Sequence, residues 1–416
     1  MIKSLLEHRT VWTLWKAVVS VQYEHITTQR DLERFCEAIS EASTIAFDTE
    51  FVSEDSYRPH FCLAQVAAAG RLAIIDAITI KDVTPFWELL AAPGHETIVH
   101  AGRQELCFCL HAVGKRLDHL FDTQIAAGMI GMEYPAAYST LVSKLLGKTL
   151  GKGETRTDWR RRPLSDRQVD YALRDVVYLA QIRDMLVERL EALERSQWLE
   201  TEIDRWQSAV EAAEFSERWR NVSGTSRLPP RALAIVRALW RWREAEAKRQ
   251  NRPPKRLLRD DLIVELSKRG SSDVKQIQSI RGMHRRGKEH YLGPIAECIA
   301  EAVALPDGQH PRPPRRAKSR PQLNLLGQFL TTALGSVCRA RQIAPSLVGT
   351  VQDMRDFVAY RLNQEKNSDG DPPALACGWR SEVVGRTIDE LLAGKLAVRV
   401  TDALGEQPLT FEPTKD

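Results

Sequence analysis

The run Ile45-Ala46-Phe47-Asp48-Thr49-Glu50-Phe51 places two acids at the end of a short apolar strand. Side chains at positions i and i+2 of a strand point to the same face, so Asp48 and Glu50 face the same way. Two neighbouring carboxylates repel each other unless a cation or a proton lies between them. A solvated strand end carries the same pair, so its meaning depends on the residues that accompany it.

Two further acids follow, each in a helix. His100-Ala101-Gly102 comes after a predicted strand and begins a helix, which places Glu105 in the first turn, where an acid is favourable for the helix alone. Tyr171 and Asp175 are four residues apart and share one face of a later helix. Neither pattern is distinctive by itself.

Periodicity around these acids predicts a mixed α/β domain. A helix is predicted after a possible capping box from Thr28 to Asp31, because apolar residues follow at helical spacing: Leu32, Phe35, Cys36 and Ile39. Strands are predicted at 44–47, 61–69, 71–76 and 97–100, and helices at 82–90, 104–113, 122–130, 139–146 and 165–193. Strands precede helices, which predicts a central sheet flanked by helices.

Composition and helix breakers predict the rest of the organisation. Ser223–Pro230 holds glycine and prolines that break helices, and 306–321 holds five prolines and five basic residues. We assign an α/β domain to 24–222, a helical unit to 226–305, a Pro/Arg-rich linker to 306–321, a second helical unit to 322–404 and a tail to 405–416, and leave 1–23 unassigned. Pro294 is expected in the first turn of a final helix of the first helical unit.

Charge and cysteine content narrow the class of protein. The chain has 416 residues and a net charge of +4, but 226–321 alone holds 23 Lys and Arg against 10 Asp and Glu. This excess indicates either a polyanionic partner or solvated helix faces. No apolar run reaches the roughly 18 residues of a membrane span, and we expect no signal peptide. Seven scattered cysteines without a CxxC pair favour reduced thiols and the cytoplasm.

Five motifs occur in order. They are Asp48-Thr49-Glu50-Phe51 with Tyr57-Arg58-Pro59 and Gln65; His100-Ala101-Gly102 with Glu105 and Leu106; Phe121-Asp122-Thr123-Gln124; Thr157-Asp158-Trp159 with Arg162-Pro163-Leu164; and Tyr171-x-x-x-Asp175. Over about residues 24–205 this set resembles the DEDD superfamily of 3′–5′ exonucleases, in its tyrosine-containing branch, and within it the ribonuclease D family. The family usually has Asp where this chain has Glu105. We interpret Asp122 as a helix N-cap, with the role of a fourth ligand as the less favoured alternative.

The resemblance implies a ribonuclease H-like α/β fold and a metal-dependent 3′–5′ exoribonuclease that releases nucleoside 5′-monophosphates, with tRNA precursors and structured RNA 3′ ends as substrates. Four acids without His or Cys suit two divalent cations, Mg²⁺ or Mn²⁺. In that scheme Asp48 bridges both ions, Glu50 and Asp175 hold the ion that activates water, and Glu105 supports the other ion directly or through water. Tyr171, a poor base with its ordinary pKa near 10, orients the attacking water.

The helical units resemble HRDC domains, which are small all-α bundles. The first, 226–305, matches at Ala234–Arg249, Arg252-Pro253-Pro254, Leu257–Leu266 and Ile280-Arg281-Gly282-Met283. The second, 322–404, matches by its position, its helical pattern and the motif Gly378-Trp379-Arg380-Ser381-Glu382-Val383-Val384-Gly385, in which we expect Trp379 to anchor a core. The basic residues that could contact RNA phosphates, unless they are only solvated, are Arg252, Lys255, Arg256, Arg281, Arg285, Arg286 and Lys288. Phe51 and His100 either stack on or hydrogen-bond the terminal nucleotide, or pack in the core.

Two other functions stay open on the sequence alone. One is a 3′–5′ exonuclease that acts on DNA, because no residue of the motifs clearly reads a 2′-hydroxyl. The other is a non-catalytic nucleic-acid-binding protein whose site has decayed at Glu105. We expect RNA as the partner, no membrane association and a monomer.

Overall fold

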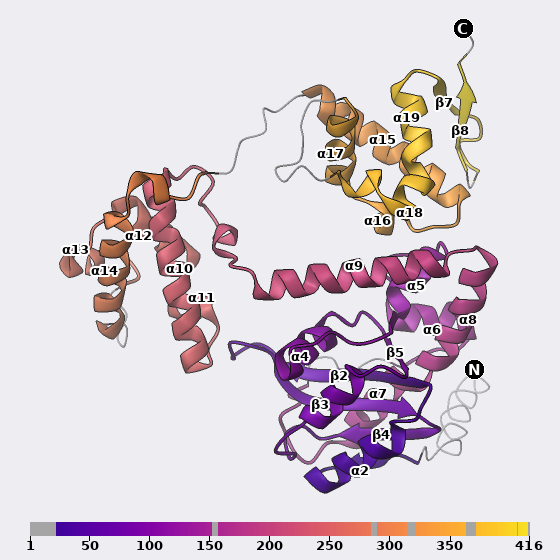
Figure 1. Cartoon of the computed structure of the whole chain (residues 1–416), viewed down its shortest axis with the longest axis horizontal. Helices are drawn as coiled ribbons and strands as arrows, with labels where there is room; N and C mark the ends of the chain where they lie inside the picture. The colour runs from indigo at the N-terminus through magenta and orange to yellow at the C-terminus, as the bar shows by residue number, and fades with distance from the viewer. Residues whose placement is uncertain are drawn as a thin grey trace, which may run out of the picture. The chain divides into compact units, whose positions relative to one another are not determined.

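The computed structural model describes residues 22–151, 157–283, 289–313, 321–362, 372–405 and 407–414 (Figure 1). The chain divides into two compact units. The first contains the described residues up to Glu50 together with Cys62–Gln207, and the second contains Phe51–Phe61 and the described residues from Ser208 onwards. Within the described residues, no helix has the length and apolar character that crossing a membrane requires.

A six-stranded mixed sheet forms the centre of the α/β domain, with strand order β1-β4-β3-β2-β5-β6. Its strands are β1 (Glu24–Ile26), β2 (Thr44–Val52), β3 (His60–Ala68), β4 (Arg71–Ile75), β5 (Glu96–Val99) and β6 (Leu120–Asp122). The pair β3–β4 is the predicted hairpin, and both residues of its turn, Ala69 and Gly70, have the positive φ that such a tight turn requires. The pairs β1–β4, β2–β5 and β5–β6 are parallel.

Eight helices among the described residues belong to this domain or continue from it. They are α2 (Gln29–Ile39), α3 (Thr84–Leu90), α4 (Arg103–Val113), α5 (Thr123–Met129), α6 (Tyr138–Leu146), α7 (Asp166–Val177), α8 (Leu179–Ala192) and α9 (Ser196–Phe215). α3 packs against α2 and α4, whereas α8 packs against β5, α5 and α6, and α7 packs against β4. This arrangement is the predicted sheet with flanking helices.

One predicted helix is wrong in its extent. The single helix expected over 165–193 is two helices that meet at Tyr178, whose backbone (φ −106°, ψ −2°) interrupts the turn. Buried apolar residues recur at spacing three across the break, with Leu173 and Val176 before it and Leu179 and Ile182 after it. The apolar pattern therefore does not show where the first helix ends.

The alternation of side chains along β2 decides which way the acids face. Phe47 is fully buried and meets Phe86 and Trp87 of α3 edge-on, with ring centroids 5.7 Å and 6.0 Å away. Thr49 shares that face of the strand, whereas Asp48 and Glu50 point to the opposite face. A tight aromatic core on one side of β2 thus fixes the register of the acids on the other.

The first helical unit is a bundle of α10 (Pro230–Gln250), α11 (Pro254–Leu257), α12 (Asp260–Arg269), α13 (Val274–Gln278) and α14 (Glu289–Ala304). Its apolar core also contains Trp219, Val222 and Leu228, so the bundle begins before the boundary at 222 that helix breakers predicted. Pro294 lies inside α14 and not in its first turn, which corrects that expectation. Residues 314–320 of the predicted linker lie outside the described residues.

The second helical unit is not purely helical. Its helices are α15 (Pro321–Ala340), α16 (Pro345–Val348), α17 (Val351–Arg361), α18 (Gly378–Arg380) and α19 (Arg386–Leu392), and a π-helical turn spans Ser381–Gly385. Strands β7 (Leu396–Val400) and β8 (Leu409–Pro413) then form an antiparallel hairpin. The tail predicted at 405–416 therefore contains a strand that belongs to this unit. An all-helical expectation missed it because the partner strand lies beyond the predicted domain end.

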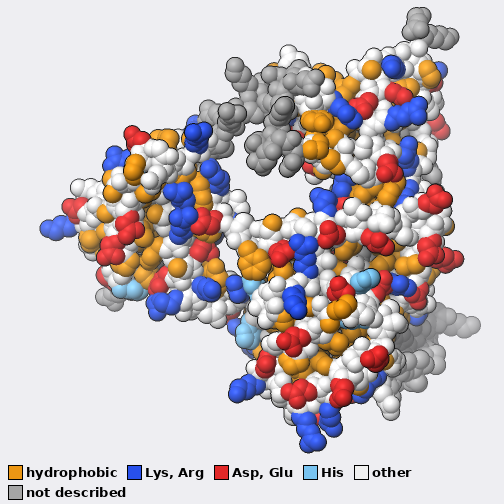
Figure 2. Space-filling model, viewed as in Figure 1, with side chains coloured by type: hydrophobic (Ala, Val, Ile, Leu, Met, Phe, Trp, Pro, Cys, Tyr) orange, Lys and Arg blue, Asp and Glu red, His pale blue; other side chains and the backbone are white. Residues whose placement is uncertain are grey.

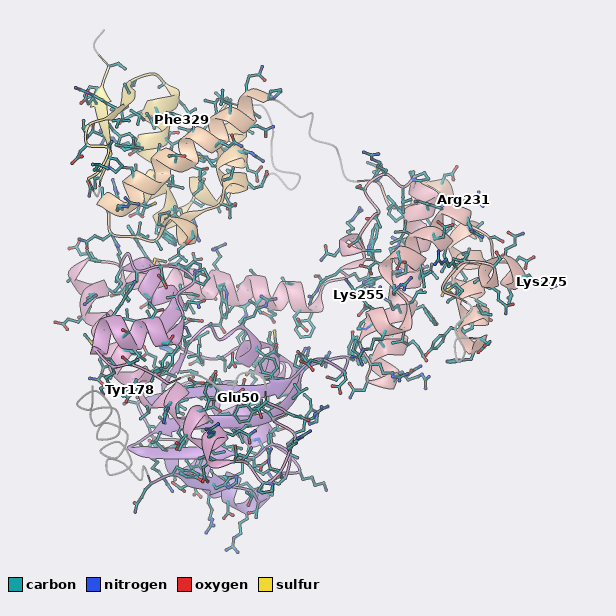
Figure 3. All side chains as sticks on the ribbon, turned by 180° about the vertical axis from the view of Figure 1, so that it is seen from behind. Glu50, Tyr178, Arg231, Lys255, Lys275 and Phe329 are labelled. Carbon is teal, nitrogen blue, oxygen red and sulfur yellow. The ribbon has the colours of Figure 1, made fainter. Side chains whose placement is uncertain are left out.

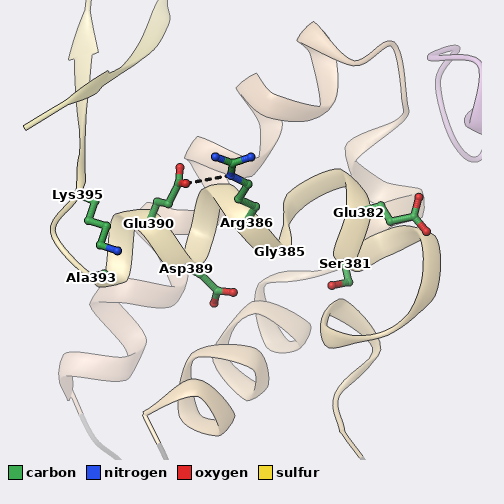
Figure 4. Close-up of a pocket in the computed structure, with 8 residues that line it drawn as sticks. All are labelled: Ser381, Glu382, Gly385, Arg386, Asp389, Glu390, Ala393 and Lys395. Carbon is green, nitrogen blue, oxygen red and sulfur yellow. Dashed lines mark hydrogen bonds and ion pairs between the residues drawn. The ribbon is translucent and has the colours of Figure 1, made fainter.

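Residues 378–385 anchor this unit. Trp379 is buried, and the Arg380 guanidinium lies 4.2 Å from its ring centre while donating to the carbonyls of Leu347 and Val348. Those carbonyls end α16, so Arg380 satisfies acceptors that the helix leaves open. The π-helical turn and α19 line a surface depression of about 530 Å³ in which Arg386 pairs with Glu390 at 3.0 Å (Figure 4).

Candidate active site

Three carboxylates from two elements come together at the sheet. Asp48 and Glu50 project from β2 and Asp175 from α7, and one oxygen of each lies within 4.8 Å of the others. All three side chains are half-buried, and Glu50 lies at the sheet (Figure 3). The i, i+2 prediction for β2 and the motif on the later helix thus describe one site.

The local sequence of α7 explains how Asp175 reaches β2. Ser165 and Gln168 form a reciprocal capping box that fixes the first turn of the helix. Gln168 also donates to Thr157 Oγ1 at 3.2 Å, which ties the preceding loop to the same turn. One turn after Tyr171 comes Asp175, and the phenol of Tyr171 hydrogen-bonds that carboxylate.

Glu105 lies outside the group of three. It is 4% exposed, and its Oε1 accepts a hydrogen bond of 2.5 Å from Thr49 Oγ1. Thr49 alternates with Asp48 and Glu50 along β2, so the longer carboxylate is held by the residue between the two acids. Direct or water-mediated support of an ion by Glu105 stays a prediction.

The turn that delivers Glu105 depends on a close approach between α4 and β5. A Cβ on Gly102 would come within 2.4 Å of Val99 Cγ2, so only glycine fits there without movement. Asp122, 1% exposed, accepts from the backbone N–H groups of Ala101 and Gly102 at 3.1 Å and 2.9 Å. It also caps α5, as predicted. These four hydrogen bonds from backbone N–H groups give Asp122 a structural role.

Burial raises the pKa of every acid in the site, and repulsion from neighbouring carboxylates adds to it for Asp48 and Glu50. Burial raises the pKa of Glu50 to about 8, with added repulsion from Asp175 and Glu105. The pKa of Glu105 rises to about 7 and that of Asp175 to about 6, chiefly through burial. Asp48 has the pKa raised well above its ordinary value by burial and then by the other three carboxylates.

The donor set fits hard divalent cations. All donors are carboxylate oxygens, without His or Cys, which is the preference of Mg²⁺ and Mn²⁺. Asp48 accepts a hydrogen bond of 3.0 Å from Gln65 Nε2, while the buried Oε1 of Gln65 has no hydrogen-bond partner among the described residues. A cation beside these carboxylates would relieve the repulsion that adds to the raised pKa values of Asp48 and Glu50.

The two predicted base-contacting residues differ in their surroundings. His100 has both ring nitrogens engaged, Nδ1 with Thr123 Oγ1 at 2.9 Å and Nε2 with the Ala136 carbonyl at 3.1 Å. A hydrogen bond from either nitrogen to a nucleotide would break one of these contacts, which favours the packing alternative. Phe51 is half-buried and follows Glu50 directly, and its stacking role stays a prediction.

Four of the seven predicted phosphate-contacting residues lie within the described part of the chain. Arg252, Lys255, Arg256 and Arg281 are exposed, and Lys255 Nζ lies 3.3 Å from Asp260. Lys255 and Lys275 lie on the surface of the α10–α14 bundle (Figure 3). Arg285, Arg286 and Lys288 lie outside the described residues. On the face shown in Figure 2, acidic side chains are interspersed among the basic ones of this bundle.

The contact of Thr49 with Glu105 was not predicted from the sequence, although Thr49 belongs to the first motif. The alternation of β2 predicts that Thr49 points away from the acids on either side of it. Two features of the sequence therefore indicated that Thr49 and Glu105 could meet: the direction of the Thr49 side chain and the extra methylene of Glu105.

Comparison with known proteins identifies the family of the chain. A family model described as 3′-5′ exonuclease matches residues 23–191, and a model described as HRDC domain matches 232–299. Ribonuclease D of Granulibacter bethesdensis is 34% identical over 384 residues, which cover 90% of this chain and 94% of that protein. Ribonuclease D of Gluconacetobacter diazotrophicus is 34% identical over 376 residues, covering 89% and 92%.

A solved structure agrees over the same length. The crystal structure of Escherichia coli RNase D, an exoribonuclease involved in structured RNA processing, superposes with a TM-score of 0.78 at 26% identity, covering 90% of this chain and 99% of that one. The similarity therefore includes both the α/β domain and the helical units that follow. On this evidence the chain belongs to the ribonuclease D family and is a 3′–5′ exoribonuclease.

Proposed function

We propose that the chain removes nucleotides from RNA 3′ ends with two divalent cations held by Asp48, Glu50 and Asp175, with Glu105 in support. The convergence of three carboxylate oxygens within 4.8 Å carries this proposal. Two divalent ions, when bound, stabilise the charge that develops on the attacking and leaving oxygens of the phosphodiester. Mg²⁺ and Mn²⁺ both suit the oxygen donors.

The chain's own residues orient the reaction. Tyr171 hydrogen-bonds Asp175, and burial together with the nearby carboxylates raises the pKa of its phenol above the ordinary value. The phenol therefore keeps its proton at neutral pH and acts by hydrogen bonding, which suits positioning of the attacking water and not proton removal. Gln65 donates a hydrogen bond to Asp48 and holds that side chain in place.

For the substrate we propose structured RNA 3′ ends, tRNA precursors above all. The support is the family, the HRDC domain at 232–299 and the exposed basic residues of that domain. We also propose that 321–414 is a second, divergent HRDC-like unit, supported by its helices and its position after the first. Free cysteines throughout the described chain support the cytoplasm as the compartment.

Matched RNA and DNA oligonucleotides of one sequence, 5′-labelled and incubated with Mg²⁺, with Mn²⁺ or with chelator, test this proposal. We expect stepwise shortening of RNA from the 3′ end, formation of nucleoside 5′-monophosphates, and loss of both with chelator. An enzyme that shortens DNA faster than RNA would favour the deoxyribonuclease alternative. Binding without shortening under any condition would favour a decayed site.

A further inference from the structure

The loop before α7 contains a motif that the proposed chemistry does not use, Trp159 and Arg162. Arg162 has five N–H donors, and each one has an acceptor within 3.1 Å. Two donors hold the Asp76 carboxylate in a bidentate pair at 2.5 Å and 2.7 Å. The others bind the carbonyls of Trp159 at 2.7 Å, Arg161 at 2.8 Å and Cys62 at 3.1 Å.

Asp76 provides a fixed anchor for this guanidinium. It follows β4 directly, its side chain is 1% exposed, and its backbone N–H donates to the Ile26 carbonyl of β1 at 2.9 Å. Its carboxylate also accepts from the N–H groups of Ile78 and Thr79. The loop carbonyls are therefore tied through Arg162 to the edge of the sheet.

Trp159 links this anchor to the site. Its side chain is 2% exposed, and its ring centre lies 6.1 Å from that of Tyr171 with the planes tilted by 35°. Arg162 holds the carbonyl of the same tryptophan. The position of the Trp159 ring, and hence of the surface that Tyr171 packs on, depends on the bond to Arg162.

We propose that Arg162 is a positioning residue for Tyr171 and acts through Trp159. The inference rests on the proposed role of Tyr171 in orienting the attacking water. Lysine cannot replace this arginine, because an ammonium has three donors, lacks the planar fork, and cannot hold one carboxylate and three carbonyls together. The neighbours Arg160 and Arg161 lie by Asp158 instead, at 2.9 Å and 3.8 Å, and do not duplicate the contact.

A double-mutant cycle on the full chain tests the proposal, with kcat and KM measured separately on a short RNA. Arg162→Lys should lower kcat about 10-fold, since a misplacement near 1 Å costs up to about 100-fold, and should leave KM within about a factor of 2. In the Tyr171→Phe background, which has no hydroxyl to position, the same change should cost less than about 2-fold. Trp159→Phe should behave in the same way with a smaller loss, and it serves as the test if Arg162→Lys does not fold.

Arg183→Lys is the matched control. Arg183 forms a comparable bidentate pair with Glu96, at 2.5 Å and 3.2 Å, and is similarly half-buried. It should lose thermal stability as Arg162→Lys does but keep kcat. A merely structural role for Arg162 would make its cost equal in both backgrounds and proportional to the folded fraction.

Three results would overturn the inference: wild-type kcat for Arg162→Lys, an equal cost with and without the Tyr171 hydroxyl, or wild-type kcat for Tyr171→Phe. The last result would also remove Tyr171 from the proposed chemistry. Asp175→Asn distinguishes failure of the proposed metal site from failure of the inference about Arg162. If Asp175→Asn is inactive, the carboxylate proposal stands even when the positioning inference fails.

Discussion

Replacing Asp175 with its neutral amide tests the charge of the site directly. Asp175→Asn keeps the volume and the hydrogen bond to Tyr171 but loses the charge that a divalent cation requires. We expect hydrolysis to fall by more than the roughly 10–100-fold that the loss of an outer-shell partner costs, while RNA binding persists. Asp48→Asn should behave alike. Rates and filter-binding affinities on one RNA measure both effects.

The control lies on the same helix. Asp170→Asn changes an exposed acid of α7, 68% exposed and 3.7 Å from Arg174, and should leave the rate unchanged. An Asp175→Asn enzyme as fast as this control would refute the assignment of the metal site.

Glu105 stands where the sequence resemblance leads us to expect Asp, and its contact with Thr49 makes a specific prediction possible. Glu105→Gln keeps the length of the side chain but replaces the charge with an amide, a weaker donor for a hard cation, so activity should fall severely. Glu105→Asp should retain substantial activity and change the relative rates with Mg²⁺ and Mn²⁺, because Mg²⁺ tolerates less departure from octahedral geometry. Initial rates against metal concentration check both variants. If Glu105→Gln matched wild type, Glu105 would have no part in the site.

The raised pKa values predict how pH affects stability. A carboxyl whose pKa rises on folding contributes stability below its ordinary pKa and loses that contribution as pH rises through the folded value, which is about 8 for Glu50 and about 6 for Asp175. Divalent cations bind the ionised form, so the stabilisation that they provide should grow over the same range. The measurement is the shift in melting temperature between saturating Mg²⁺ and chelator at about pH 5.5 and about pH 8.5, with the larger shift expected at the higher pH.

Glu50→Gln is the matched variant for that measurement, because its amide does not titrate. It should reduce both the Mg²⁺ shift and its dependence on pH. Equal shifts at the two pH values in the unmodified chain would show that these carboxylates do not titrate with metal binding.

At the scale of elements, the contact between α4 and β5 holds Glu105 in place. Gly102→Ala would bring a Cβ within 2.4 Å of Val99 Cγ2, so the helix or the strand has to move. We expect a loss of about 1–3 kcal/mol in the free energy of unfolding, as for other overpacked sites, together with a lower rate. Gly335→Ala in α15, where the added Cβ meets nothing within 4 Å, should instead stabilise by about 0.5–1 kcal/mol. Denaturant unfolding and rates on one RNA would show both effects, and an unchanged Gly102→Ala protein would contradict them.

Elements were predictable from sequence where local chemistry marks both their ends and their faces. Helix α2 begins at a Thr28 cap and buries the four residues expected from its spacing: Leu32, Phe35, Cys36 and Ile39. The β3–β4 hairpin followed from Gly70 between two apolar runs. The break at Tyr178 did not follow, because apolar spacing continues through it. The motifs named Asp48, Glu50 and Asp175, the three acids that the structure brings together. The hydrogen bond between Glu105 and Thr49 was not predictable, because it depends on tertiary packing.

At the scale of the whole molecule, the features that were not predicted depend on contacts between residues that lie far apart in the sequence. Strand β7 becomes recognisable only through pairing with β8, which lies beyond the predicted end of the unit. Trp219 and Val222 join the core of the α10–α14 bundle although they precede the predicted linker. Helix breakers mark places where regular structure stops, whereas domain boundaries depend on which apolar residues share a core.

The basic excess of 226–321 makes a prediction about salt. If Arg252 and Arg256, both exposed in the α10–α14 bundle, contact RNA phosphates, replacing both with Gln should weaken binding. The slope of log affinity against log salt should fall by about 1.4, because each phosphate contact on a single strand contributes about 0.7. Fluorescence anisotropy with one single-stranded RNA at several salt concentrations measures the slope. Arg30→Gln with Lys81→Gln, two exposed cations of the α/β domain, makes the same change in net charge and should leave the slope nearly unchanged. Equal slopes for all three proteins would mean that Arg252 and Arg256 are solvated and do not contact the RNA.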